Sequence, residues 1–180
     1  MNLQDLLVKS IAESTAQVFS TMLAVSLPDG RFSIENSAPG SNDGVVSFIG
    51  LAGSWVGSGS ICCSPALACR ICSQMLMTET SSVNEDVLDA VAELTNMIVG
   101  GVKNDLELEL GPLGLSIPTV VYGRNFKTKS AGSAEWTVAR FSWDDEELEV
   151  KLCLAPRGKD AHPILHGNTQ PYPLEVSEQA

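Results

Sequence analysis

The sequence is poor in basic residues, and this shortage disfavours two classes of partner. Its 180 residues include 11 Lys and Arg against 22 Asp and Glu, which gives a formal net charge of −11. Nucleic-acid binding needs a basic surface to meet the phosphates, so the charge argues against DNA or RNA as a ligand. An anionic membrane surface is disfavoured for the same reason.

Long apolar runs are also missing. No stretch approaches the ~20 consecutive apolar residues that a membrane-spanning helix needs. The first residues, Met-Asn-Leu-Gln-Asp, show no basic segment followed by an apolar core, so they do not resemble a secretory signal. A length of 180 residues with 44% hydrophobic residues suits one domain with a sizeable core. We therefore expect a cytoplasmic protein.

The five cysteines lack the pattern of a metal site. Cys69-x-x-Cys72 alone would suggest zinc or redox chemistry, but the other pair, Cys62 and Cys63, is adjacent in sequence. Neighbours on a strand point to opposite faces, so these two thiols cannot share one metal ion easily. With Cys153 the number is odd. We expect buried, reduced, metal-free thiols.

Three other motifs are expected to carry no chemistry. His162 and His166 have metal-ligand spacing only on a helix, and Pro163 between them opposes a helix. The acidic run at residues 144–147 lacks the ligand spacing of a calcium loop and predicts a hairpin turn. The glycine- and serine-rich run at residues 56–63 is followed by no Gly-Lys-Ser/Thr, so it is not a phosphate loop.

The hydrophobic patterns predict helices and strands in the order helix, strands, two helices, strands. Helices are expected over residues 2–23, 64–77 and 82–102. Strands are expected at residues 24–27, 32–34, 45–51, 56–63, 115–122, 136–143 and 148–154. Polar loops are expected at residues 35–44 and 126–135. This order predicts an α/β domain over residues 1–156 with a single mixed or antiparallel sheet and three helices on one face, followed by a flexible tail at 157–180.

The helix at residues 82–102 combines an apolar stripe with a polar face. The stripe recurs at spacings of three and four: Val87, Val91, Leu94, Ile98 and Val102. At about 100° per residue, Asp89, Glu93 and Asn96 fall within about 60° of one another on the opposite side. Burial of the stripe should therefore expose two carboxylates and a carboxamide as a set.

The ends of this helix are also marked in the sequence. Ser82, with Glu85 three residues later, fits a capping box at the start. Gly100 and Gly101 mark either the end of the helix or a place where another backbone approaches closely.

The residues from Asp89 to Gly100 resemble the active helix of the CheC/CheX/FliY group of chemotaxis phosphatases. The CheX-type branch has the motif (Asp/Ser)-x-x-x-Glu-x-x-Asn, which Asp89, Glu93 and Asn96 match position by position. The resemblance extends from about residue 3 to about residue 156. The first helix has no Glu-x-x-Asn, whereas the two-site branch has a second copy of the motif there. The resemblance implies a CheC-like α/β fold with three helices beside a sheet.

The same resemblance implies a function: hydrolysis of the aspartyl phosphate on a CheY-like receiver domain of a response regulator. Glu93 and Asn96 would be catalytic and Asp89 supporting, with no metal or other cofactor of the protein's own and Mg²⁺ on the receiver. It also allows a homodimer. One alternative is a non-catalytic adaptor that docks a receiver or flagellar switch protein through this helix face. A hydrolase of small molecules with Glu93 as general base fits less well, because small ligands bind in concave sites.

Overall fold

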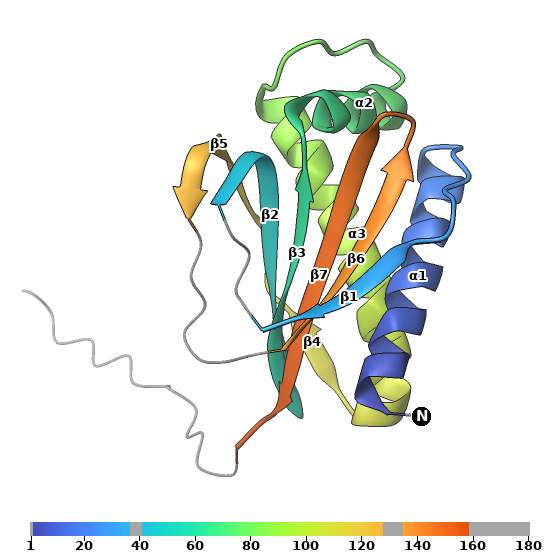
Figure 1. Ribbon diagram of the computed structural model, residues 1–180, viewed down its shortest axis with the longest axis vertical. Helices are drawn as coiled ribbons and strands as arrows, with labels where there is room; N and C mark the ends of the chain where they lie inside the picture. Colours follow the sequence, from blue (N-terminus) through green and yellow to red (C-terminus); the bar gives the residue numbers. More distant parts are fainter. Residues whose placement is uncertain (1, 37–40, 128–134, 159–180) are drawn as a thin grey trace, which may run out of the picture.

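The computed structural model describes residues 2–36, 41–127 and 135–158, which form three helices and seven strands (Figure 1). In chain order the elements are α1 (Leu3–Met22), β1 (Arg31–Glu35), β2 (Ser41–Gly53), β3 (Trp55–Cys63), α2 (Pro65–Leu76), α3 (Glu85–Leu110), β4 (Leu113–Leu115), β5 (Thr119–Lys127), β6 (Trp136–Trp143) and β7 (Glu146–Pro156).

All seven strands belong to one antiparallel sheet. Its order is β1-β6-β7-β3-β2-β4, and β5 pairs with β2 beside β4. The long strand β2 serves two partners on the same side, because residues 41–48 pair with β5 and residues 51–53 pair with β4. The β2–β3 and β6–β7 hairpins form as the alternating sequence predicts.

The helices cover one face of this sheet. In Figure 1, α3 runs behind the strands, α1 packs against α3 at the right, and α2 crosses near the top. The apolar stripes of the helices and the inward side chains of the strands make one core, and among its fully buried members are Leu7, Ile11, Phe19, Ile49, Ile61, Leu67, Ile71, Leu94, Ile98, Leu106 and Leu148. The predicted fold class, a single sheet with three helices on one face, is confirmed.

The helix that carries the candidate site begins later than predicted. Its cap is Asn84, whose side-chain oxygen accepts a hydrogen bond from the Val87 amide at 3.0 Å. The predicted capping box, with Ser82 as the cap and Glu85 as its partner, is therefore wrong. Asn caps helices as well as Ser does, and Asn84 immediately precedes the first helical residue.

We expect Asn84→Ala to lower the free energy of unfolding by about 0.5–2 kcal/mol, because the Val87 amide loses its partner. Ser82→Ala is the matched control, since Ser82 is exposed and lies outside the helix. Thermal denaturation of both variants measures the difference. An equal loss of stability in the two would contradict the assignment of the cap to Asn84.

The same helix ends later than predicted. It passes through Gly100 and Gly101 without a break and ends at Leu110, not at Val102. The apolar stripe continues beyond the glycines with Leu106, which is fully buried. Packing against the neighbouring helix outweighs the roughly 1 kcal/mol that each glycine costs in a helix. The sequence left two interpretations of the glycine pair open; the helix end is wrong, and at Gly101 a neighbouring segment does approach closely, through the Ser14 side chain.

Two predicted boundaries in the first half of the chain are wrong. Residues 24–27 form no strand, because Ala24 adopts a left-handed conformation at φ 53° and the Val25 amide donates to the Phe19 carbonyl at 3.1 Å. The end of α1 therefore uses the amide that a strand would need. The predicted loop at residues 35–44 is shorter, since β2 already begins at Ser41.

The predicted strand at residues 115–122 is divided. Leu113–Leu115 pairs with the far end of β2, and Thr119–Lys127 pairs with its beginning. Pro118 lies between the two strands, where its missing amide costs no sheet hydrogen bond. The predicted loop at residues 126–135 loses its first two residues to β5, and residues 128–134 lie outside the described part.

Two expectations remain, one on the C-terminal tail and one on membrane-spanning helices. Residues 159–180, including His162 and His166, lie outside the described residues, so the tail and its histidines stay predictions. No helix within the described ranges is long and apolar enough to cross a bilayer.

Candidate functional site

Helix α3 presents the three predicted site residues to solvent together. Asp89, Glu93 and Asn96 are all exposed, as the periodicity predicts. The predicted apolar stripe on the opposite side is fully buried: Val87, Val91, Leu94, Ile98 and Val102. The core therefore fixes the rotation of the helix, and that rotation sets which side chains a partner can reach.

The backbone under the site is well supported. Thr95, the neighbour of Asn96, is fully buried, and its hydroxyl donates to the Val91 carbonyl at 2.7 Å. On the side facing α1, the Ser14 hydroxyl donates to the Ile98 carbonyl at 2.7 Å. These contacts hold α3 against its surroundings, and a rigid element positions functional side chains better than a loop does.

The side chains of the motif are available for a partner. Among the described residues, neither Glu93 nor Asn96 takes part in a side-chain hydrogen bond or ion pair. A carboxamide can both donate and accept a hydrogen bond, whereas an ionised carboxylate only accepts. The pair therefore offers complementary hydrogen-bonding groups to a partner.

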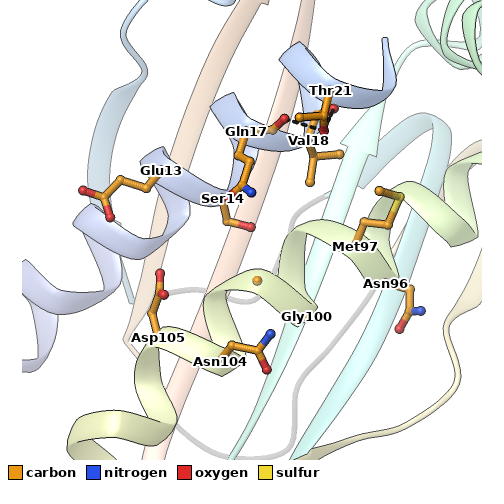
Figure 2. Close-up of a pocket in the computed structure, with 11 residues that line it drawn as sticks. Glu13, Ser14, Gln17, Val18, Thr21, Asn96, Met97, Gly100, Asn104 and Asp105 are labelled. Atoms are coloured by element: carbon orange, nitrogen blue, oxygen red, sulfur yellow. Dashed lines mark hydrogen bonds between the residues drawn. The ribbon is translucent and has the colours of Figure 1, made fainter.

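A groove adjoins Asn96 between the two long helices; we call it the α1–α3 groove. It has a volume of about 510 Å³ and is lined by Glu13, Ser14, Gln17, Val18, Thr21, Asn96, Met97, Gly100, Gly101, Asn104 and Asp105. Figure 2 shows Glu13 and Asp105 near one end, and Asn96 and Met97 near the other. No Lys or Arg is among these described lining residues, so the groove has a negative charge.

Sequence reasoning missed Gln17 and Asn104 as members of this surface. Asn104 is eleven positions after Glu93, which places it only about 20° away around the same helix. The helical periodicity could have identified Asn104, but the helix was expected to end at Val102, before this residue. Gln17 lies on α1 and reaches the surface only because α1 packs beside α3, which the sequence of neither helix shows.

Helix α1 contributes no second pair of a carboxylate and a carboxamide at the motif spacing to this surface. Glu13 is exposed at the edge of the groove, 4.0 Å from the Lys9 ammonium. The residue three positions later is Ala16, which has no hydrogen-bonding side chain. The carboxamide chemistry at this surface therefore comes from Asn96, Asn104 and Gln17.

The cysteines lie away from this surface as buried free thiols: Cys62, Cys63, Cys69, Cys72 and Cys153. Burial raises the pKa of Cys62 to about 11 and the pKa of Cys63 to about 12, so both stay protonated near neutral pH. A protonated thiol is a poor nucleophile and a poor metal ligand. Within the described residues, no three His, Cys, Asp or Glu side chains are grouped closely enough to hold a metal ion.

The acidic run lies at the predicted hairpin turn, which is shorter than expected: Asp144 and Asp145 connect the strands, and Glu146 and Glu147 already pair within β7. Asp144 adopts φ 53° at the turn and pairs with Arg70 at 3.0 Å. Glu147 pairs with Arg31 on the edge strand. These carboxylates point to separate arginines, which agrees with a turn and not with a calcium loop.

Comparison with known proteins identifies the family. The family model described as chemotaxis phosphatase CheX matches residues 45–142. The chain is 32% identical over 110 residues to the CheY-P phosphatase CheX of Thermotoga maritima, and the match covers 60% of this chain and 71% of that protein.

Solved structures share the fold over most of the chain. A CheC-like superfamily protein from Shewanella sp. PV-4 superposes with a TM-score of 0.74 at 28% identity, over 86% of this chain and 99% of that one. A chain in the crystal structure of the CheX–CheY–BeF₃–Mg²⁺ complex from Borrelia burgdorferi gives a TM-score of 0.66 at 25% identity, over 82% and 97% of the two chains. The family model alone spans more than half of the sequence and includes Asp89, Glu93 and Asn96. The chain therefore belongs to the chemotaxis phosphatase CheX family.

Proposed function

We propose that this protein is a cytoplasmic phosphatase that removes the phosphoryl group from the aspartate of a CheY-like receiver domain. The observation that carries the proposal is the exposed pair Glu93 and Asn96 on the helix that the family motif marks. The T. maritima relative is a CheY-P phosphatase, and the B. burgdorferi relative is found in a complex with CheY, which supports a receiver as the partner.

The reaction needs little covalent help from the enzyme. In an aspartyl phosphate the phosphorus is bonded to a carboxylate oxygen, so the leaving group is a stable carboxylate. Water attacks phosphorus, the bond between phosphorus and the carboxylate oxygen breaks, and the products are the free aspartate and inorganic phosphate. Catalysis of phosphoryl transfer is mainly positioning and charge stabilisation. A side chain that fixes the attacking water in line is therefore sufficient.

Asn96 fits the role of holding that water. Its carboxamide oxygen can accept a hydrogen bond from the water, and its NH₂ group can donate one to a phosphoryl oxygen. Because the amide has no charge, it does not repel the phosphoryl group. Its exposed position on a convex helix allows it to enter a partner's active site, which a residue at the bottom of a pocket cannot do.

Glu93 fits the role of docking the helix. It lies less than one turn before Asn96, and its carboxylate can pair with a cation beside the receiver's phosphate. Asp89, one turn earlier on the same face, would support this contact. The Mg²⁺ that neutralises the phosphate would belong to the receiver. The enzyme would therefore complete an active site that its partner already contains.

The direct test is release of inorganic phosphate from each phosphorylated receiver domain of the organism. Accelerated release from at least one receiver is expected. If a receiver binds with no acceleration, the protein is an adaptor that uses the same helix face. If none binds, both functions are excluded.

We expect Glu93→Ala to raise KM by about tenfold and to change kcat less, because a docking contact is present in both the ground and transition states. Glu109→Ala is the matched control: it removes an exposed carboxylate from the same helix, about 160° away around its axis. Steady-state phosphate release measures both. A loss confined to kcat, with KM unchanged, would contradict the docking role.

A further inference from the structure

Gly100 interrupts the row of side chains that contains Asn96. In a helix, residues four apart lie one above the other, so Asn96, Gly100 and Asn104 form a row. A Cβ atom placed on Gly100 would meet nothing closer than the Leu115 Cδ1 atom at 3.9 Å. The helix therefore has open space next to Asn96, and Gly100 itself lines the α1–α3 groove.

Internal packing does not explain this glycine. Packing does explain the neighbouring Gly101, because a Cβ there would lie 2.2 Å from the Ser14 hydroxyl oxygen. Gly100 meets no such obstacle and has ordinary helical geometry, so alanine would fit and would stabilise the helix by about 0.5–1 kcal/mol. The glycine costs stability, and the space that it leaves opens to the outside of the molecule.

The surface around Gly100 is suited to hydrogen bonding with another chain. Gln17 on α1 and Asn104 on α3 each supply an amide donor and acceptor, the groups that pair with an exposed backbone (Figure 2). Glu13 and Asp105 at the far end favour a neutral or basic segment and disfavour the phosphoryl group itself. The phosphate would therefore stay outside the groove, next to Asn96.

The size of a protein interface also requires contacts beyond the motif. A specific interface covers roughly 800 Å² on each partner, far more than the side chains of Glu93 and Asn96 can supply. A receiver that brings its phosphoaspartate to Asn96 must cover the adjoining surface, and the α1–α3 groove is the hollow that adjoins it.

We propose, resting on the function proposed above, that Gly100 is a docking determinant. Its missing side chain admits a neutral or basic surface segment of the receiver into the α1–α3 groove beside Asn96, and Gln17 and Asn104 hydrogen-bond to that segment. Gly100 thereby decides which receivers can approach closely enough for Asn96 to act.

The test compares Gly100→Ala, Gly100→Leu and the parent. Binding of the phosphorylated receiver and phosphate release are measured separately. We expect Gly100→Leu to weaken receiver binding at least about tenfold, because the leucine fills the space the partner needs, and Gly100→Ala to have a smaller effect. The melting temperature should not fall in either variant, since both residues favour a helix more than glycine does.

Glu109→Leu is the matched control, because it places the same apolar side chain at an exposed position of α3 that does not line the α1–α3 groove. Parental binding by Gly100→Leu would overturn the proposal, even if Asn96→Ala proved inactive and the phosphatase function stood. If the parent released no phosphate, the proposed function would fail, and receiver binding by the same variants would still decide the role of Gly100.

A double substitution provides a second test that does not depend on whether Gly100→Leu folds. Gln17→Ala combined with Asn104→Ala removes both carboxamides without adding volume, and both changes are to a strong helix former. We expect KM for the receiver to rise while kcat is retained. An unchanged KM in this double variant would exclude the hydrogen-bonding part of the proposal.

Discussion

Asn96→Ala is expected to lower kcat for receiver dephosphorylation by about 10²–10³-fold, the effect of losing one well-placed hydrogen-bonding group in other enzymes. The carboxamide orients the water most strongly when the bond to phosphorus forms, so its loss weakens the transition state more than the bound ground state. Receiver binding should therefore survive. Single-turnover dephosphorylation, with binding measured in parallel, separates the two quantities.

The melting temperature is the control that shows whether Asn96→Ala still folds. Asn96 is exposed and, within the described chain, makes no side-chain hydrogen bond, so truncation should shift the melting temperature by no more than a few degrees. Asn96→Asp keeps the shape but adds a negative charge beside the phosphoryl oxygens, and we expect it not to restore the rate. Dephosphorylation by Asn96→Ala at the parental rate would eliminate the proposed mechanism and the catalytic assignment of α3.

The exposed face of α3 could be predicted because it depends on one periodicity. Val91, Leu94 and Ile98 must be buried together, and this requirement turns Glu93 and Asn96 outward whatever lies beneath the helix. The strand pairs were predictable in the same way, from alternation and short turns. Which residues act chemically is a different question, and the roles of Glu93 and Asn96 stay predictions until the variants are assayed.

The helix ends could not be predicted with the same success, because they depend on contacts between distant segments. Nothing near Gly101 in the sequence shows that Ser14 packs against it, yet that contact accounts for a glycine inside a helix that continues to Leu110. Because the helix was predicted to end at Val102, Asn104 was not recognised as part of the same helix face. The α1–α3 groove was missed entirely, since it needs both helices in place.

The contact between Ser14 and Gly101 therefore supports both the fold and the site. It sets how closely α1 approaches α3, and this spacing determines the width of the α1–α3 groove beside Asn96. The Ser14 hydroxyl, which is buried, donates to the Ile98 carbonyl at 2.7 Å in the same place. A side chain at Gly101 would disturb packing and hydrogen bonding together.

Gly101→Ala is expected to lower the free energy of unfolding by about 2 kcal/mol, because overpacking costs about 1–3 kcal/mol and a buried hydrogen bond about 1, against a gain of up to about 1 from helix propensity. The new Cβ would lie 2.2 Å from the Ser14 hydroxyl oxygen and 3.1 Å from its Cβ, so Ser14 must rotate away from the Ile98 carbonyl or α1 must move. The melting temperature should fall by roughly 4–8 °C.

Gly100→Ala is the matched comparison, since it makes the same change one residue away and should raise stability by about 0.5–1 kcal/mol. A double-mutant cycle tests the cause. Ser14→Gly removes both clashing atoms and leaves only the Ser14 Cα, 3.9 Å from the new methyl group. Combined with Gly101→Ala, it should cost less than the sum of the two single changes. If the effects are instead additive, the close approach of Ser14 to Gly101 is not what requires the glycine, and the spacing of α1 and α3 must be set by other contacts.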